Sequence, residues 1–328
     1  MSPLFGRRRG GDRDDRAAER DARERRDAES LERLERGQIP LAAAERLAAL
    51  ADAQGATAPA FSSDLSVSEY ALLHDLDVVP ITLVTGSSIY HVGWQNVFYN
   101  APTEFETVSH AYNESRRLAL GRLLEEAQTV RADAVVGLRI HQGSHDWAAG
   151  SVEFIAAGTA VRLPEGLRDP SGPVLTDLDG QGFWQLCSAG IRPVGIVAAT
   201  SVHYAPAGLQ TVRAQSGLFG SSWRNQELTD YTAGIYAARR RAMGAITEQA
   251  LALGAEGVVG VQVDQQVRGH RVSRGGVERE DMIVTLHIIG TAIREDASLP
   301  RTAAAPRTAL SLGTPLPRSS TRPSARSL

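Results

Sequence analysis

The sequence predicts an α+β fold in which one small unit is built twice along the chain. A long helical pattern, a turn and an apolar strand occupy residues 112–137, and a matching stretch occupies residues 235–260. Ten residues are identical between the two stretches at one constant offset and without a gap. Such self-similarity indicates an internal repeat, so each half of the chain is expected to fold in the same way.

Length and composition agree with two globular units. A chain of 328 residues is usual for two domains of about 100–200 residues each. Its hydrophobic content of 42% is ordinary for units that bury a core. The formal net charge of -3 gives no overall attraction to nucleic acid or to a membrane surface. We therefore expect neither a specific nucleic-acid partner nor a membrane.

Missing residue types exclude several kinds of chemistry. No lysine occurs, which excludes Schiff-base and P-loop lysines. Cys187 is the only cysteine, so one chain can form neither a disulfide nor a thiolate-based zinc or iron–sulfur site. The charged start has no apolar signal region, and no run of about 18 apolar residues occurs. We expect a cytoplasmic protein.

Residues 1–60 are predicted to form a charged, largely disordered arm with one short helix. Arginine alternates with aspartate and glutamate up to about residue 36, which is typical of a disordered or solvated helical segment. The short helix follows Ile39 and Pro40, with Leu41, Leu47 and Leu50 on one side. This arm could dock on the body or on a protein partner.

The first unit is expected over residues 61–165. Its first helix carries Tyr70, Leu72 and Leu73, with Ser63 or Asp64 as the N-cap. The sequence from Thr85 to Ser88 predicts a break in the following strand. The remaining elements are expected as strands at 79–84 and 89–92, a long helix at 104–130, and strands at 135–141 and 152–163.

A linker over residues 166–173 precedes the second unit, which is expected over residues 174–296. The same elements recur there in the same order, with longer connections before the long helix and between the last two strands. The latter connection, around residues 267–281, is predicted to be a loop. Core packing is predicted for Val135, Val136, Val258 and Val259. Residues 297–328 are rich in proline, serine, threonine and arginine, and are expected to be disordered.

Histidines supply the candidate metal ligands. His141, His145 and Asp146 bracket a strand end and a loop, and His91 lies in an earlier strand. Imidazole together with carboxylate suits zinc, nickel or copper. The matching region of the second unit holds Asp264, His270, Glu278, Glu280 and Asp281. The competing interpretation is that these are surface histidines in polar loops. No Ser-His-Asp spacing, paired carboxylates or HExxH motif supports a hydrolase.

An arginine pair recurs on both long helices, as Arg116-Arg117 and Arg239-Arg240. One interpretation is that these side chains form salt bridges on a solvated helix face. The other is that they pair subunits, because one helix over a small sheet leaves strand edges to cover. The sequence does not separate the two.

With these motifs in hand, the chain resembles the YbjQ-like family of heavy-metal-binding domains. The shared motifs are the strand break Val84–Ser88, the arginine-containing long helix, the junction ending Val135-Val136-Gly137 and the closing strand Gly158–Val161. All recur in the second unit, with Ala199 in place of the glycine of the break. The resemblance implies two tandem dodecin-like β-α-β-β domains and a homo-oligomer that forms a ring of five. It implies no established reaction and no fixed set of ligand residues.

Three functional hypotheses follow. The first is a non-enzymatic, ring-forming protein whose units bind a transition metal. The second is a structural or interaction scaffold without metal, in which the N-terminal arm and the C-terminal tail recruit protein partners. The third is an enzyme with a site between subunits. Two stacked rings, or one unit masking the other, are both compatible with a tandem pair.

Overall fold

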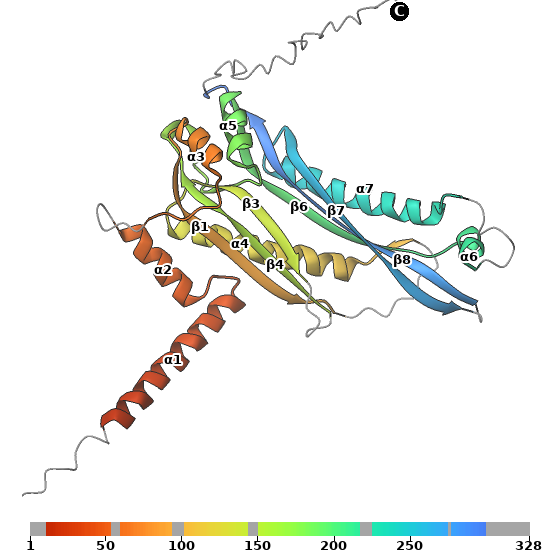
Figure 1. Cartoon of the computed structure of the whole chain (residues 1–328), viewed down its shortest axis with the longest axis horizontal. Helices are drawn as coiled ribbons and strands as arrows, with labels where there is room; N and C mark the ends of the chain where they lie inside the picture. Colours follow the sequence, from red (N-terminus) through yellow and green to blue (C-terminus); the bar gives the residue numbers. More distant parts are fainter. Residues whose placement is uncertain are drawn as a thin grey trace, which may run out of the picture.

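The computed structural model describes residues 11–53, 60–93, 102–143, 150–216, 225–274 and 277–299. Figure 1 shows two sheets side by side and helix α1 projecting away from the body. In chain order the elements are α1 (Gly11–Glu35), α2 (Leu41–Asp52), α3 (Val67–His74), β1 (Val79–His91), β2 (Thr103–Glu104), α4 (Glu106–Thr129), β3 (Ala134–Gly143), β4 (Ser151–Arg162), the short 3-10 turn η2 (Glu165–Leu167), β5 (Val174–Leu175), α5 (Gly180–Ser188), β6 (Ile191–Ala205), α6 (Leu209–Ser216), α7 (Thr229–Ala252), β7 (Gly257–Arg274) and β8 (Val277–Glu295).

The α+β prediction is confirmed, with one long helix on each of two sheets. The sheet of unit 1 has the order β1-β4-β3-β5, and the sheet of unit 2 has the order β2-β6-β8-β7. Helix α4 packs on β1 and β4, and α7 packs on β6 and β8. Apolar side chains of α4, among them Ala119, Leu123 and Ala127, are fully buried because they recur on one helix face.

The two sheets exchange short strands. Strand β2 lies in the first half of the sequence but pairs with β6 of unit 2. Strand β5 lies in the second half but pairs in parallel with β3 of unit 1. Each unit therefore completes the sheet of the other, and the two halves of the chain form one continuous structure.

The predicted break at Thr85–Ser88 is wrong, because β1 runs unbroken through it. Its backbone pairs with β4 residue by residue from Thr82 to His91. Gly86 has a packing role here, since a Cβ at this position would lie 2.0 Å from the carbonyl oxygen of Ala119 in α4. The glycine lets the helix approach the strand closely, as glycine inside a strand commonly does.

The predicted loop around residues 267–281 is also wrong. Strands β7 and β8 continue pairing through this stretch, out to Arg274 and Val277. The antiparallel ladder satisfies backbone groups that a loop would leave to water, which favours the longer hairpin. Helix α6, which packs near this hairpin, was not predicted.

The arm, predicted to be largely disordered, is helical over α1. Helix α2 begins after Pro40, as expected, and buries Leu47 against α4. The first turn of α3 also differs from expectation, because its N-cap is Ser66, which forms a capping box with Glu69. The predicted disordered tail lies outside the described residues from residue 300 onward.

Candidate functional site at the junction between the two units

Helix α4 of unit 1 closes the free edge of strand β6 in unit 2. The amide of Asn113 donates to the carbonyl of Thr200 (2.9 Å) and accepts from its N–H (2.9 Å). Two residues along, the N–H of Val202 donates to Ser109 Oγ (2.9 Å), and its carbonyl accepts from the N–H of Phe105 (2.8 Å). The edge is thus covered, and it is not exposed to pair with another strand there.

Arg116 anchors the same contact from a buried position. Its guanidinium donates to Thr200 Oγ1 (2.6 Å) and to the carbonyl of Ala198 (3.0 Å), and it lies over the ring of Phe154. Burial lowers the pKa of Arg116 to about 10, which leaves it charged at neutral pH. The neighbouring Arg117 instead pairs with Glu114 at the surface (2.6 Å). The salt-bridge interpretation is therefore confirmed for Arg117, and Arg116 joins the two units within one chain, so pairing between subunits stays a prediction.

His287 lies on β8 in the buried part of this junction. Its Nδ1 is 2.8 Å from Thr200 Oγ1, and its ring lies 5.4 Å from that of Tyr112 on α4. Its Nε2 is buried without a hydrogen-bond partner in the structure. Burial and the charge of Arg116 lower the pKa of His287 to about 4, against an opposing effect of Asp264. The imidazole is therefore neutral at physiological pH.

Unit 2 returns the contact by covering β3 of unit 1. The N–H of Gly137 donates to the carbonyl of Leu178 (2.8 Å), and the N–H of Leu138 donates to that of Thr176 (3.0 Å). Helix α5 places Phe183, which is 1% exposed, in a hydrophobic cluster with Val136 and other residues of unit 1. The core of unit 1 is therefore completed by side chains from unit 2.

Each unit also contains one Asp–Thr pair beside a glycine. Asp64 accepts from Thr159 Oγ1 (2.6 Å), and Asp177 accepts from Thr291 Oγ1 at the equivalent place. Burial raises the pKa of Asp177, and its Oδ2 has no hydrogen-bond partner among the residues that the structure describes. A cavity of about 530 Å³ beside Asp177 is lined by residues of both units, including Gly137. Each threonine hydroxyl therefore holds the segment that precedes the first helix of its own unit.

Of the four predicted metal ligands, the structure describes His91 and His141, and it does not bring these two together. His91 and His141 are exposed on β1 and β3, with β4 between these strands. Their partners on β4 are Ser151 and Ile155, so the two histidines are separated by about 13 Å along the sheet and about 10 Å across it. His145 and Asp146 lie outside the described residues.

The fit of a metal was tested on the side chains that the structure describes. Among these, no group of three or more histidine, cysteine, aspartate or glutamate residues could hold a metal ion. The β7–β8 hairpin carries His270, Glu278 and Glu280. The carboxylate of Asp281 accepts hydrogen bonds from the Tyr204 hydroxyl and from the N–H of Ala207 (2.8 Å), and it pairs with Arg279 (3.1 Å). The described residues therefore do not fit a metal centre.

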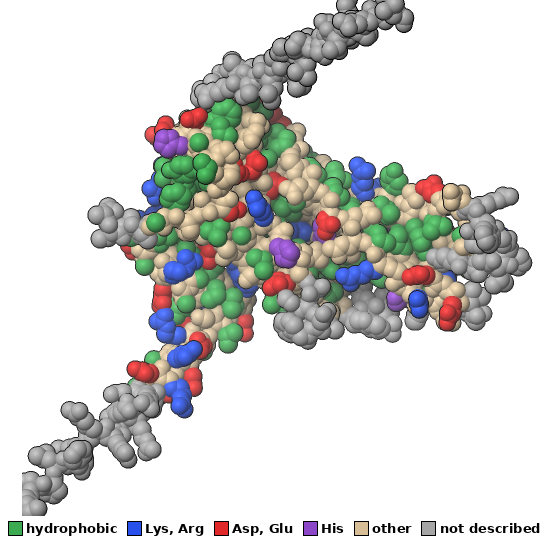
Figure 2. Space-filling view, viewed as in Figure 1, with side chains coloured by type: hydrophobic (Ala, Val, Ile, Leu, Met, Phe, Trp, Pro, Cys, Tyr) green, Lys and Arg blue, Asp and Glu red, His purple; other side chains and the backbone are tan. Residues whose placement is uncertain are grey.

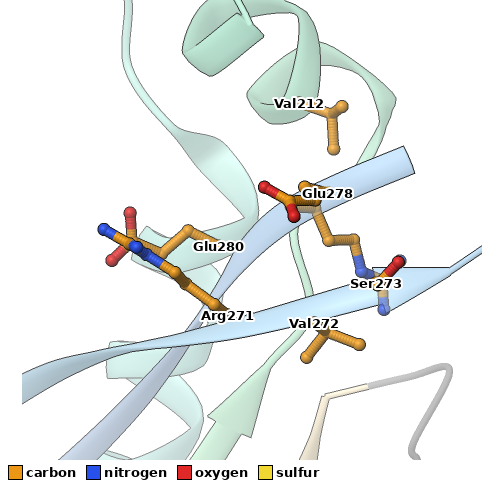
Figure 3. Close-up of a pocket in the computed structure, with 7 residues that line it drawn as sticks. Val212, Arg271, Val272, Ser273, Glu278 and Glu280 are labelled. Atoms are coloured by element: carbon orange, nitrogen blue, oxygen red, sulfur yellow. The ribbon is translucent and has the colours of Figure 1, made fainter. Parts of the chain in front are cut away.

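A surface cavity of about 390 Å³ lies between α6 and the β7–β8 hairpin. Val212 comes from α6, and the other walls come from the two strands (Figure 3). Arg271 and Glu280 face one another across the hairpin and lie side by side in this view. The lining combines apolar and charged side chains with the hydroxyl of Ser273, which lies opposite Glu278 on the hairpin.

The residues of the junction were largely missed by sequence reasoning. Asn113 and His287 are central to the junction. Unit 2 has Tyr236 at the position equivalent to Asn113, and unit 1 has Ile155 at the position equivalent to His287. A search for identities between the units passes over such differences. The signal that could have found these residues is a difference between the units: a polar residue in one unit at a position where the other unit has an apolar or aromatic residue.

Comparison with known proteins gives the family of the chain. A family model described as "Putative heavy-metal-binding" matches residues 63–164 and again residues 191–295. The chain is 38% identical over 206 residues to the "Encapsulin nanocompartment protein Rv1762c" of Mycobacterium tuberculosis, a match that covers 61% of this chain and 76% of that protein. It is 38% identical over 91 residues to a UPF0145 protein of Methanococcus vannielii, covering 25% and 82% of the respective chains.

A UPF0145 protein of Methanococcus maripaludis is 37% identical over 94 residues, covering 26% of this chain and 80% of that protein. None of these descriptions names an enzymatic activity. Across the described residues, no helix is long and apolar enough to cross a membrane. Because the family model matches both repeats, this chain belongs to the YbjQ family and carries two of its domains in tandem.

Proposed function

We propose that this protein is a non-enzymatic, cytoplasmic structural protein that forms a homo-oligomer and works with an encapsulin-type nanocompartment. The junction between its units is the observation that supports self-assembly. Asn113, Ser109 and Arg116 close a strand edge through hydrogen bonds to backbone groups and to the Thr200 hydroxyl. A surface of this kind is suited to joining protein units.

The relative from Mycobacterium tuberculosis supports the nanocompartment part of the proposal. It is named an encapsulin nanocompartment protein, and the match covers 76% of its length. The family resemblance implies five chains in the ring. Proteins that line or fill such a compartment need defined contacts with copies of themselves or with a shell, which the junction illustrates within one chain.

Native mass spectrometry of the purified full chain tests self-assembly. We expect a closed oligomer at micromolar concentration, with five chains as the number implied by the family. A single 35.1 kDa chain would refute the proposal. Coexpression with an encapsulin shell protein tests the second part, and we expect co-elution with shell-sized particles during size-exclusion chromatography.

The family description supports transition-metal binding as a second candidate function. Zinc, nickel or copper would use His141 with His145 and Asp146, which are close in sequence, and His91 on β1 is the fourth candidate ligand. The same spectrum recorded after incubation with each metal tests this candidate. Stoichiometric metal that is lost in a His141→Ala/His145→Ala variant would support it, and a metal-free oligomer would refute it.

A further inference from the structure

Equivalent strands of the two units differ in how well they are covered. Leu138 on β3 is 2% exposed, whereas Val261, its equivalent on β7, is 42% exposed. Val136 is fully buried, but its equivalent Val259 is half-buried. Hydrophobic side chains are exposed where β7 and β8 run (Figure 2). Since the fold is the same, the difference comes from what lies against each strand.

On β3 the cover is the segment leading into α5, which inserts Phe183. The same segment exists in unit 1, as residues 61–66 followed by α3. There Phe61 and Tyr70 take the positions of Val174 and Phe183, but they are 47% and 39% exposed. Their rings stack at 5.8 Å, and hydrophobic side chains gather around α3 on the surface (Figure 2). Exposed aromatic pairs of this kind are typical anchors of protein interfaces.

The long helices show the same asymmetry. Arg116 on α4 is 6% exposed because α4 lies against β6. Its equivalent on α7, Arg239, is exposed. Tyr236, at the position of Asn113, is 64% exposed. Helix α7 therefore has an exposed counterpart of the face by which α4 binds a strand edge, with the arginine kept and Tyr236 in place of Asn113.

The strand that such a face would bind is also present, and at its outer edge Arg122 of α4 donates to the carbonyl of Ser87 (2.6 Å). Strand β1 of unit 1 is the equivalent of β6. Ile89 on β1 is 55% exposed, whereas Val202 at the same place on β6 is 2% exposed. Ser87 is exposed, whereas its equivalent Thr200 is 4% exposed. Unit 1 thus lacks the cover that unit 2 receives.

We propose that a second copy of this chain docks head-to-tail, with its unit 1 on unit 2 of the first copy. In this contact, Phe61 and Tyr70 of the second copy lie against β7 of the first copy, and β1 of the second copy lies against α7 of the first. The arrangement between chains follows that of the junction between the units of one chain. Both uncovered surfaces belong to the same contact, because each is the counterpart of one side of the intrachain junction, with Tyr236 and Ile155 in place of Asn113 and His287. A heterologous contact of this type closes into a ring or continues as a filament. The inference rests on the self-assembly proposed above and specifies its surface.

Adjacent arginines on α7 provide a matched test. Arg239 is equivalent to buried Arg116, and Arg240 is equivalent to Arg117, whose side chain is 66% exposed. Both residues are exposed on the described chain, and Arg→Glu changes the charge equally at each. We expect Arg239→Glu to reduce the native mass spectrum to single chains at micromolar concentration, whereas Arg240→Glu should leave the oligomer intact.

Thiol cross-linking gives a second readout. A chain carrying Ser87→Cys is mixed with one carrying Tyr236→Cys and treated with a short bismaleimide, since these positions correspond to the contact between Thr200 and Asn113. Cys187 is buried and should not react. We expect a covalent dimer only from the mixture. If the oligomer survives Arg239→Glu and no cross-link forms, the proposed docking surface is wrong, but self-assembly is not refuted. If the wild-type protein is a single chain, both proposals are wrong.

Discussion

Units 1 and 2 have the same fold but different surroundings. The equivalent strands β3 and β7 both carry a glycine with positive φ at the same place, Gly137 and Gly260. Yet Leu138 is covered by a segment from unit 2, whereas Val261 is exposed. The repeat therefore fixes the architecture of each unit, and the neighbour decides which of its surfaces is core. Four measurements test this difference in covering between the two units.

The largest effect is expected from placing a charge in the covered copy. Val136→Asp buries a carboxylate in a fully closed cluster, and we expect a loss of more than about 4 kcal/mol in the free energy of unfolding. Val259→Asp is the matched control, because Val259 is half-buried, and it should cost about 1 kcal/mol in the single chain. Urea unfolding monitored by circular dichroism measures both. Equal losses would contradict the difference in covering.

The second prediction concerns pH and His287. Its pKa is near 4 in the folded chain and near 6.5 when unfolded, so below pH 6.5 the unfolded state takes up a proton that the folded state refuses. The contribution of His287 to the free energy of unfolding is complete above pH 6.5. About 3 kcal/mol of it is lost as the pH falls toward 4.

His287→Ile introduces the residue that unit 1 has at the equivalent position, Ile155. This variant should show a weaker pH dependence of the free energy of unfolding. Urea titrations at pH 7 and pH 4.5 of both chains provide the measurement. If the two chains lose the same stability between these pH values, the buried imidazole is not the cause.

The third prediction separates the two arginines that occupy equivalent positions. Arg116→Ala removes hydrogen bonds to Thr200 and Ala198 and should cost about 2 kcal/mol. Arg239→Ala should lower the melting temperature only at protein concentrations where copies associate. Melting curves over a hundred-fold dilution series distinguish them. A concentration-dependent effect of Arg116→Ala would count against the intrachain junction.

The smallest effect is expected in the N-terminal arm. Glu125 on α4 accepts from Arg33 (3.1 Å) and from the N–H of Ile39 (2.7 Å), which holds the arm on unit 1. Glu125→Ala should weaken this attachment by about 1 kcal/mol and speed amide exchange in α2. Glu248→Ala changes the exposed equivalent in unit 2 and should leave that exchange unaltered. Unchanged exchange in the first variant would refute the anchoring role.

Local pattern predicted much of the fold. The apolar spacing placed the long helix at 104–130, and the structure has α4 at Glu106–Thr129. The repeat then predicted α7 and the strands that follow each helix. These elements depend on side-chain periodicity within a short window, which the sequence contains in full.

The candidate site could not be predicted in the same way. Gly86 and Ser88 indicated a broken strand, and only the close approach of α4 explains why glycine lies within a continuous one. Asn113 and Thr200 are 87 residues apart, and their contact requires both units to be folded and paired. The repeated unit and its long helices follow from the pattern of side chains along the chain. Only the tertiary structure decided which copy is covered, because burial at a junction depends on long-range contacts that no local period encodes.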